Sequence, residues 1–169
     1  MKYTLIALAV ALSGCAAPYR QAPHSYVFAA FDPAVHDPYV GAGPNQLDGQ
    51  AFLRQRGGGI VTCAGAKVMV LPATAYMREL IGVVLSGGQP PEDQRPPEKY
   101  RSLMRSSQCD AQGNFTVTGL PPGRWIVATA VQWQVGYGGQ GGIVQREVDV
   151  PFGSRLLLSD DDFKRPLSR

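Results

Sequence analysis

Short apolar runs separated by clusters of turn residues fill the chain from Leu47 onward. Within several of these runs apolar and polar residues alternate, which is typical of strands that bury one face. Turn signals at this spacing favour an all-β, antiparallel β-sandwich. Seven or eight strands are expected, and the candidates are residues 47–53, 60–63, 67–71, 103–109, 115–118, 124–134, 143–150 and 155–158.

One stretch has the period of a helix instead. Four apolar residues stand at positions i, i+3, i+4 and i+7, namely Met77, Leu80, Ile81 and Val84. We therefore expect a short inserted helix that packs one face on the sheet. Residues 86–97 follow and contain four prolines, which predicts a loop.

The run from Arg124 to Gln134 is apolar on both faces, as the alternation of side chains along a strand shows. One face carries Trp125, Val127, Thr129, Val131 and Trp133, and the other carries Ile126, Ala128 and Ala130. This pattern predicts a central strand that is covered on both sides.

Five glycines among the seven residues 136–142 predict a mobile, exposed loop at the rim of the sandwich. Tyr137 is the only large side chain of this loop, so it is a candidate contact residue for a partner, with Trp133 at the base of the loop. The alternative is that Tyr137 folds back and covers the hydrophobic edge. Residues 136–141 also satisfy G-x-G-x-x-G, but a strand is expected next, whereas dinucleotide binding requires a helix there.

The first residues have the parts of an export signal. Lys2 precedes an apolar stretch of ten residues, Tyr3–Leu12, which is too short to span a bilayer because a spanning helix needs roughly 20 residues. Leu12-Ser13-Gly14-Cys15 resembles the lipobox of bacterial lipoproteins. This resemblance implies a signal peptide over residues 1–14, lipidation of Cys15 and attachment to a membrane. Ala16 stands where an aspartate would favour the inner membrane, so the resemblance implies the outer membrane.

Residues 15–45 are expected to form a Pro-rich, lipidated tether. Prolines recur every few residues with no apolar period between them, which disfavours helix and central strand. The segment also carries five aromatic residues, more than a fully solvated linker needs. Within it, Tyr26–Phe31 is the part best suited to lie against the domain.

Cys63 and Cys109 remain once Cys15 is lipidated. An even pair in an oxidising, exported compartment suggests a disulfide. Such a bridge would close a loop of 45 intervening residues, worth about 4 kcal/mol on the chain-entropy estimate. Two free, buried thiols are the alternative.

Two motifs resemble those of carboxypeptidase regulatory-like, or transthyretin-like, β-sandwich domains. They are Cys109-Asp110-Ala111-Gln112-Gly113-Asn114-Phe115 and Gly119-Leu120-Pro121-Pro122-Gly123-Arg124-Trp125, and the looser strand pattern extends the likeness over residues 46–158. The resemblance implies an Ig-like or transthyretin-like sandwich that binds, spaces or supports, and it transfers no catalytic residue.

Enzyme chemistry has little support in the sequence. Some transthyretin-like proteins hydrolyse 5-hydroxyisourate with histidines and a C-terminal Tyr-Arg-Gly-Ser, whereas here both histidines, His24 and His36, lie in the expected tether and the chain ends in Pro-Leu-Ser-Arg. Without a histidine in the domain, a nucleophile with a histidine base is not expected. Asp160–Asp162 form a run without the spaced oxygens of a calcium loop, so we expect a polar tail over residues 159–169. No metal and no cofactor are predicted.

The charge balance excludes one further class of partner. Removal of Lys2 with the signal peptide lowers the formal net charge from +3 to +2, too little for a nucleic-acid-binding surface. The sequence therefore predicts a lipid-anchored, non-enzymatic envelope module that binds a partner or has a structural role, and an envelope protein is the leading candidate for the partner. The alternatives are a glycan-binding module that uses aromatics near Trp133 and Tyr137, and a hydrolase with an unrecognised site.

Overall fold

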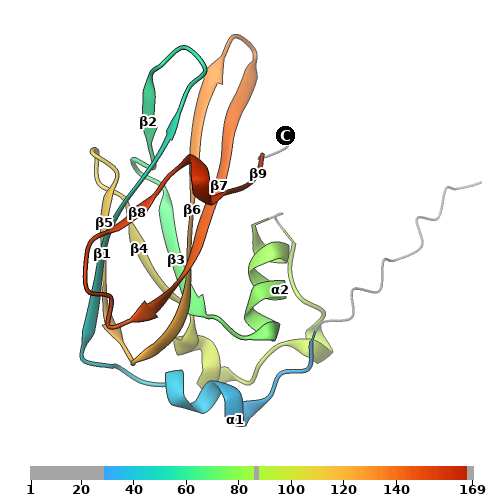
Figure 1. Ribbon diagram of the computed structural model, residues 1–169. Coiled ribbons are helices and arrows are strands. Elements are labelled where there is room, and N and C mark those ends of the chain that lie inside the picture. The colour runs from blue at the N-terminus through green and yellow to red at the C-terminus, as the bar shows by residue number, and fades with distance from the viewer. Residues whose placement is uncertain (1–28, 86–87, 167–169) are drawn as a thin grey trace, which may run out of the picture.

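The protein is a sandwich of two β-sheets with short helices at one end and on one face (Figure 1). The computed structural model describes residues 29–85 and 88–166. The predicted fold class is confirmed, although one pairing, between the first strand and the eighth, is parallel. None of the helices in the described part of the chain is both long enough and apolar enough to cross a membrane.

The first sheet has four strands, with β1 (Asn45–Arg54) at its centre. Its neighbours are β2 (Ile60–Thr62), β5 (Asn114–Leu120) and β8 (Leu156–Leu158). The second sheet has the order β4 (Arg105–Gln108), β3 (Lys67–Pro72), β6 (Gly123–Val135), β7 (Gly138–Val150) and β9 (Phe163–Pro166). The two hairpins β1–β2 and β6–β7 extend side by side to the upper pole of the molecule in Figure 1.

Strand β6 is buried on both faces, which confirms the prediction from its two-sided apolar pattern. Trp125, Val127 and Val131 belong to the core between the sheets. Ile126 and Ala128 point to the other face, where they pack with buried residues of helix α2 (Ala75–Val84) and of the 3-10 helix η3 (Glu98–Leu103). The domain therefore has two apolar layers that share one central strand.

Helix α2 forms where the apolar period predicted it, and polar contacts fix its position. The Thr74 hydroxyl accepts a hydrogen bond from the Met77 amide and so caps the first turn. Arg78 donates two hydrogen bonds to Glu147 on β7, at 2.6 and 3.0 Å. These bonds, with the nearby charge of Arg124, lower the pKa of Glu147. The Pro-rich stretch after α2 contains a short 3-10 helix, η2 (Glu92–Gln94).

Residues 29–45 pack on the lower pole. For Phe31 this agrees with the expectation that Tyr26–Phe31 lies against the domain, whereas residues 32–45 are not the extended tether that was predicted. They include one turn of helix, α1 (Pro33–His36), and the 3-10 turn η1 (Asp37–Tyr39). His36 is 1% exposed, and one of its ring nitrogens lies 2.9 Å from the Thr74 hydroxyl. Phe31 stacks on the His36 ring, and Tyr39 meets Trp125 edge to face. The free energy gained by burying these rings outweighs the tendency of a proline-rich segment to remain extended and solvated.

A disulfide joins Cys63, just after β2, to Cys109, just after β4. Because β2 and β4 belong to different sheets, the bridge connects the two layers of the sandwich. The Cα atoms are 5.8 Å apart, within the range that a disulfide spans without moving the backbone.

Candidate functional site

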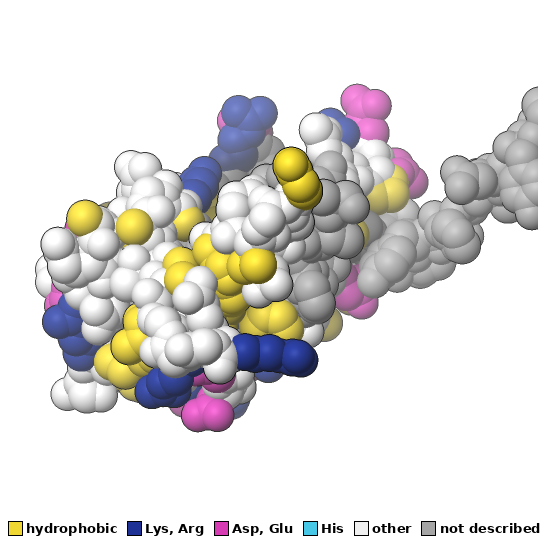
Figure 2. All heavy atoms as spheres, turned by 90° about the horizontal axis from the view of Figure 1, so that it is seen from above, with side chains coloured by type: hydrophobic (Ala, Val, Ile, Leu, Met, Phe, Trp, Pro, Cys, Tyr) yellow, Lys and Arg dark blue, Asp and Glu magenta, His cyan; other side chains and the backbone are white. Residues whose placement is uncertain are grey.

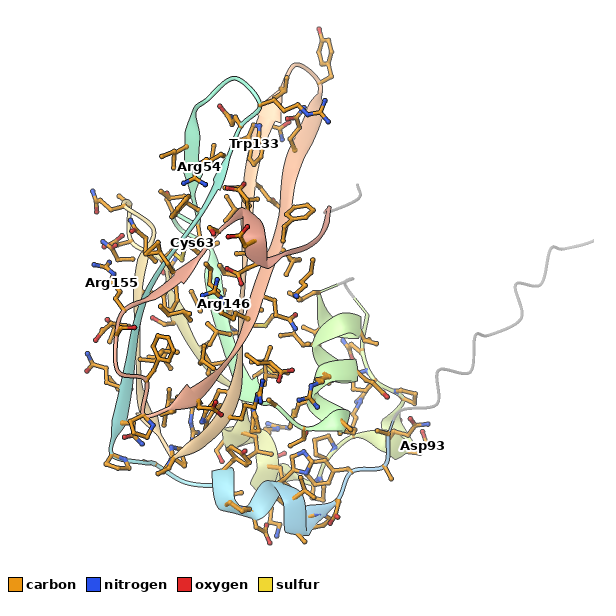
Figure 3. The ribbon with its side chains drawn as sticks, in the orientation of Figure 1. Arg54, Cys63, Asp93, Trp133, Arg146 and Arg155 are labelled. Carbon is orange, nitrogen blue, oxygen red and sulfur yellow. A yellow bond between two sulfur atoms is a disulfide. The ribbon has the colours of Figure 1, made fainter. Side chains whose placement is uncertain are left out.

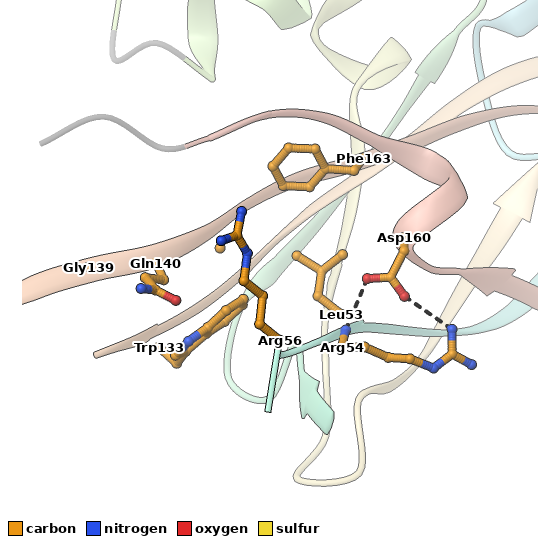
Figure 4. A pocket seen from close by; sticks show the side chains of 9 residues that line it. Leu53, Arg54, Arg56, Trp133, Gly139, Gln140, Asp160 and Phe163 are labelled. Atoms are coloured by element: carbon orange, nitrogen blue, oxygen red, sulfur yellow. Dashed lines mark hydrogen bonds and ion pairs between the residues drawn. The ribbon is translucent and has the colours of Figure 1, made fainter. Parts of the chain in front are cut away.

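A groove of about 500 Å³ opens at the upper pole, between the two hairpins and the start of β9. Three separate segments of the chain build it. Its lining residues are Leu53, Arg54, Arg56, Trp133, Gly139, Gln140, Gly141, Asp160 and Phe163 (Figure 4). Figure 2, which views the molecule from above, shows hydrophobic side chains gathered at this pole with Lys and Arg side chains beside them.

Trp133 supplies the main aromatic surface of the groove. The residue lies near the end of β6, where the strand continues beyond the buried core, and it is half-buried against that core. Gly141 on the neighbouring strand β7 has a φ of +102°, and a Cβ atom there would lie 3.0 Å from Cζ3 of Trp133. The glycine therefore gives the indole room to lie across the β6–β7 ribbon.

Arg54 and Asp160 form the polar wall opposite Trp133 (Figure 4). Asp160 accepts hydrogen bonds from the Arg54 backbone amide at 3.0 Å and from its guanidinium at 3.1 Å. The same guanidinium lies 5.4 Å from the centre of the Phe52 ring. Both the carboxylate and the guanidinium are thus held in place before any ligand arrives.

An ion pair below the groove fixes the segment that carries Asp160 and Phe163. Asp162, 5% exposed, accepts two hydrogen bonds from Arg146 on β7, at 2.6 and 2.7 Å. Asp162 also accepts a hydrogen bond from the Ser159 amide, closing a capping box around the 3-10 turn η4 (Asp160–Asp162). The prediction of a solvated polar tail is therefore wrong for residues 159–166, which turn back and pair with β7.

The expected mobile loop at residues 136–142 is also different in the structure. Only Gly136 and Tyr137 form the turn, because Gly138–Gly142 pair in register with Val135–Val131. Tyr137 is fully exposed at the tip and so does not cover the hydrophobic edge. It is absent from the lining of the groove, so the structure separates the two candidate contact residues.

Arg56 and Gln140 complete the lining as exposed polar side chains. Together with Arg54, Asp160 and Phe163, they were missed in the sequence. These residues come together only because three segments that are distant in the sequence pair as strands or pack side by side. The order of apolar and polar residues along the chain does not reveal such long-range contacts. Cys15 lies outside the described residues. Within residues 29–85 and 88–166, no three His, Cys, Asp or Glu side chains are grouped as metal ligands.

A comparison with solved structures finds a likeness in fold. The chain is similar to a proposed carbohydrate-binding protein, PA1324, from Pseudomonas aeruginosa, with 21% sequence identity and a TM-score of 0.63. The similarity covers 79% of this chain and 99% of that protein. No family model matches the chain, and no curated protein matches it. At this level of identity the likeness establishes a shared fold.

Proposed function

We propose that the protein is a non-catalytic carbohydrate-binding module whose ligand lies in the groove around Trp133. The observation that carries this proposal is the half-buried indole set among fixed polar side chains in a preformed groove. The shared fold with PA1324, itself a proposed carbohydrate-binding protein, gives independent support.

The chemistry of the groove suits a sugar. A pyranose ring has one face of C–H groups, which stacks on an aromatic surface such as that of Trp133. Its hydroxyl groups need hydrogen-bond donors and acceptors around the ring edge, and the side chains of Arg54, Arg56 and Gln140 supply them. A flat protein interface needs neither a groove of this size nor this ring of hydrogen-bonding groups, so the glycan is preferred to the protein partner.

A hydrolase is less well supported by the same groove. Glycoside hydrolysis ordinarily requires two carboxyl groups that flank the bond to be cleaved. Among the described residues that line the groove, Asp160 is the single carboxylate, and Arg54 already occupies both of its oxygens. The arrangement supports binding rather than bond cleavage.

The groove predicts the effect of removing its aromatic surface. Trp133→Ala is expected to weaken saccharide binding about 5- to 30-fold, because a stacked aromatic side chain in a binding site contributes roughly 1 to 2 kcal/mol. Glycan-array screening followed by calorimetric titration of the best saccharide measures this change. Trp133→Phe, which keeps a smaller ring, should recover part of the affinity.

Tyr137→Ala is the matched control, because it removes an exposed aromatic side chain that does not line the groove. Saccharide affinity of this variant should stay within about twofold of the parent, a difference under roughly 0.5 kcal/mol. If Tyr137→Ala abolishes binding and Trp133→Ala does not, the ligand contacts the hairpin tip and the groove assignment is wrong.

We also propose that the module works from a lipid anchor at Cys15 in the outer membrane, on the strength of the Leu-Ser-Gly-Cys sequence. Cys15→Ser should give an unprocessed or soluble product, because the thiol that accepts the diacylglycerol is removed. Palmitate labelling and membrane fractionation check this, with Cys63→Ser as a control that keeps Cys15. A Cys15→Ser chain that is still labelled and still sediments with outer membranes would exclude the anchor.

A further inference from the structure

The groove has an excess of positive charge. Its lining contains two arginines, Arg54 and Arg56, and one carboxylate, Asp160, which leaves one formal positive charge. The Arg54–Asp160 ion pair neutralises one arginine internally. Arg56 is therefore the source of the remaining charge.

Arg56 has no acidic partner among the described residues. Neither an ion pair nor a hydrogen bond of its guanidinium is present there, although Arg54, Arg78, Arg101, Arg124 and Arg146 each pair with a carboxylate. Figure 4 shows the Arg56 side chain extending along the groove between Trp133 and Phe163, with its guanidinium near Gln140. A free guanidinium presents five N–H donors in a planar fork and accepts nothing.

The other side chains of the groove also offer more hydrogen-bond donors than free acceptors. The Trp133 indole offers only an N–H donor, and the Asp160 oxygens already accept from Arg54. The Gln140 amide alone offers a side-chain acceptor without a partner in the groove. A ligand that fits must therefore bring acceptors, and a planar carboxylate matches the guanidinium fork with two parallel hydrogen bonds.

We propose that the groove selects acidic saccharides, with the carboxylate of a uronic acid on Arg56 and the sugar ring against Trp133. This inference rests on the proposed carbohydrate-binding function and specifies its ligand class. A phosphorylated sugar can also pair with a guanidinium, but its nearly double negative charge exceeds the single unpaired positive charge of the groove, so we assign the carboxylate.

The test compares saccharides of one shape and different charge. Tetragalacturonate, its methyl ester and galactotetraose are titrated into the protein by calorimetry, with galactose 1-phosphate as a fourth probe. The acid should bind about tenfold more tightly than the ester, as expected for a charge-assisted hydrogen-bonded pair. The advantage should shrink as salt is added, because the groove is open to solvent.

Arg56→Gln should lower the affinity for the acid about tenfold and the affinity for the ester by a clearly smaller factor, so that the preference for the acid disappears. Arg155→Gln is the matched control: it removes the same charge from an exposed side chain far from the groove (Figure 3). Thermal melting of both variants establishes that they are folded.

Each outcome bears on a separate statement. Equal binding of acid, ester and neutral tetrasaccharide overturns the acidic preference and leaves the carbohydrate-binding function intact. Equal losses in Arg56→Gln and Arg155→Gln overturn the assignment to Arg56 and indicate general charge attraction. Binding of galactose 1-phosphate without binding of the uronate overturns the choice of carboxylate. Failure of every saccharide, with melting unchanged, overturns the proposed function itself.

Discussion

Replacing Cys63 and Cys109 together by alanine is expected to lower the free energy of unfolding by about 4 kcal/mol. The bridge spans 46 positions in the sequence and joins the two sheets. Without the bridge, the unfolded chain is no longer closed into a loop and gains conformational entropy. Most of the destabilisation comes from this gain in the entropy of the unfolded state. Urea unfolding followed by tryptophan fluorescence measures the change, because the buried Trp125 reports on the core between the sheets.

The control for this experiment is the parent chain unfolded with and without a reducing agent. Reduction should reproduce most of the loss seen in the double variant, while the double variant itself should not respond to the reductant. A loss below about 1 kcal/mol, well under the usual range for a native bridge, would contradict the prediction. So would thiol titration that finds Cys63 and Cys109 free in a Cys15→Ser background.

Gly141→Ala is expected to destabilise the domain by about 3 kcal/mol, the upper end of the usual cost of overpacking, and to weaken ligand binding in the same variant. At a φ of +102° an L side chain is strained, and its Cβ would overlap the carbonyl oxygen of Val131 on the facing strand. The same Cβ would press on the Trp133 ring, so the groove changes shape together with the sheet. Thermal melting and saccharide titration of one preparation measure both effects.

Gly138→Ala provides the comparison within the same hairpin. A Cβ at Gly138 would meet only the Val135 carbonyl oxygen, at an ordinary 3.7 Å. The free energy of unfolding of the Gly138→Ala variant should differ from that of the parent by less than about 0.5 kcal/mol, as is usual for surface substitutions. If Gly138→Ala and Gly141→Ala are equally destabilising, the destabilisation comes from replacing any glycine of this strand. In that case the close contacts specific to Gly141 do not explain it.

The sequence predicted the elements whose apolar residues recur at a regular spacing. The two faces of β6 and the i, i+3, i+4, i+7 stripe of α2 could be read directly, because periodicity records which side chains are buried. The two lower-pole rings of Phe31 and Tyr39 were visible as aromatics in a proline-rich stretch, but the packing surface that they meet is built by later residues.

The elements that were missed are stabilised by partners distant in sequence. Gly138–Gly142 carry a single side chain, that of Gln140, so no alternation can be recognised there. They form a strand because β6 offers them a complete row of hydrogen-bonding partners. Strand β9 has too few apolar residues to be recognised, and it is held by the Arg146–Asp162 pair at its start. The groove depends on both elements, so of its lining only Trp133 could be singled out beforehand.

The described chain enters the domain at the pole opposite the groove. The first described residue, Ala29, donates a hydrogen bond to Glu79 on α2 at the lower pole, and the groove lies at the upper pole (Figure 1). Strand β6, with its 13 residues, runs most of the way between the poles, a span of about 40 Å at the usual rise per residue. If the domain is attached to a surface through residues that precede Ala29, as proposed above, the groove lies at the end of the domain away from that attachment, where it is open to polymers in the surrounding medium.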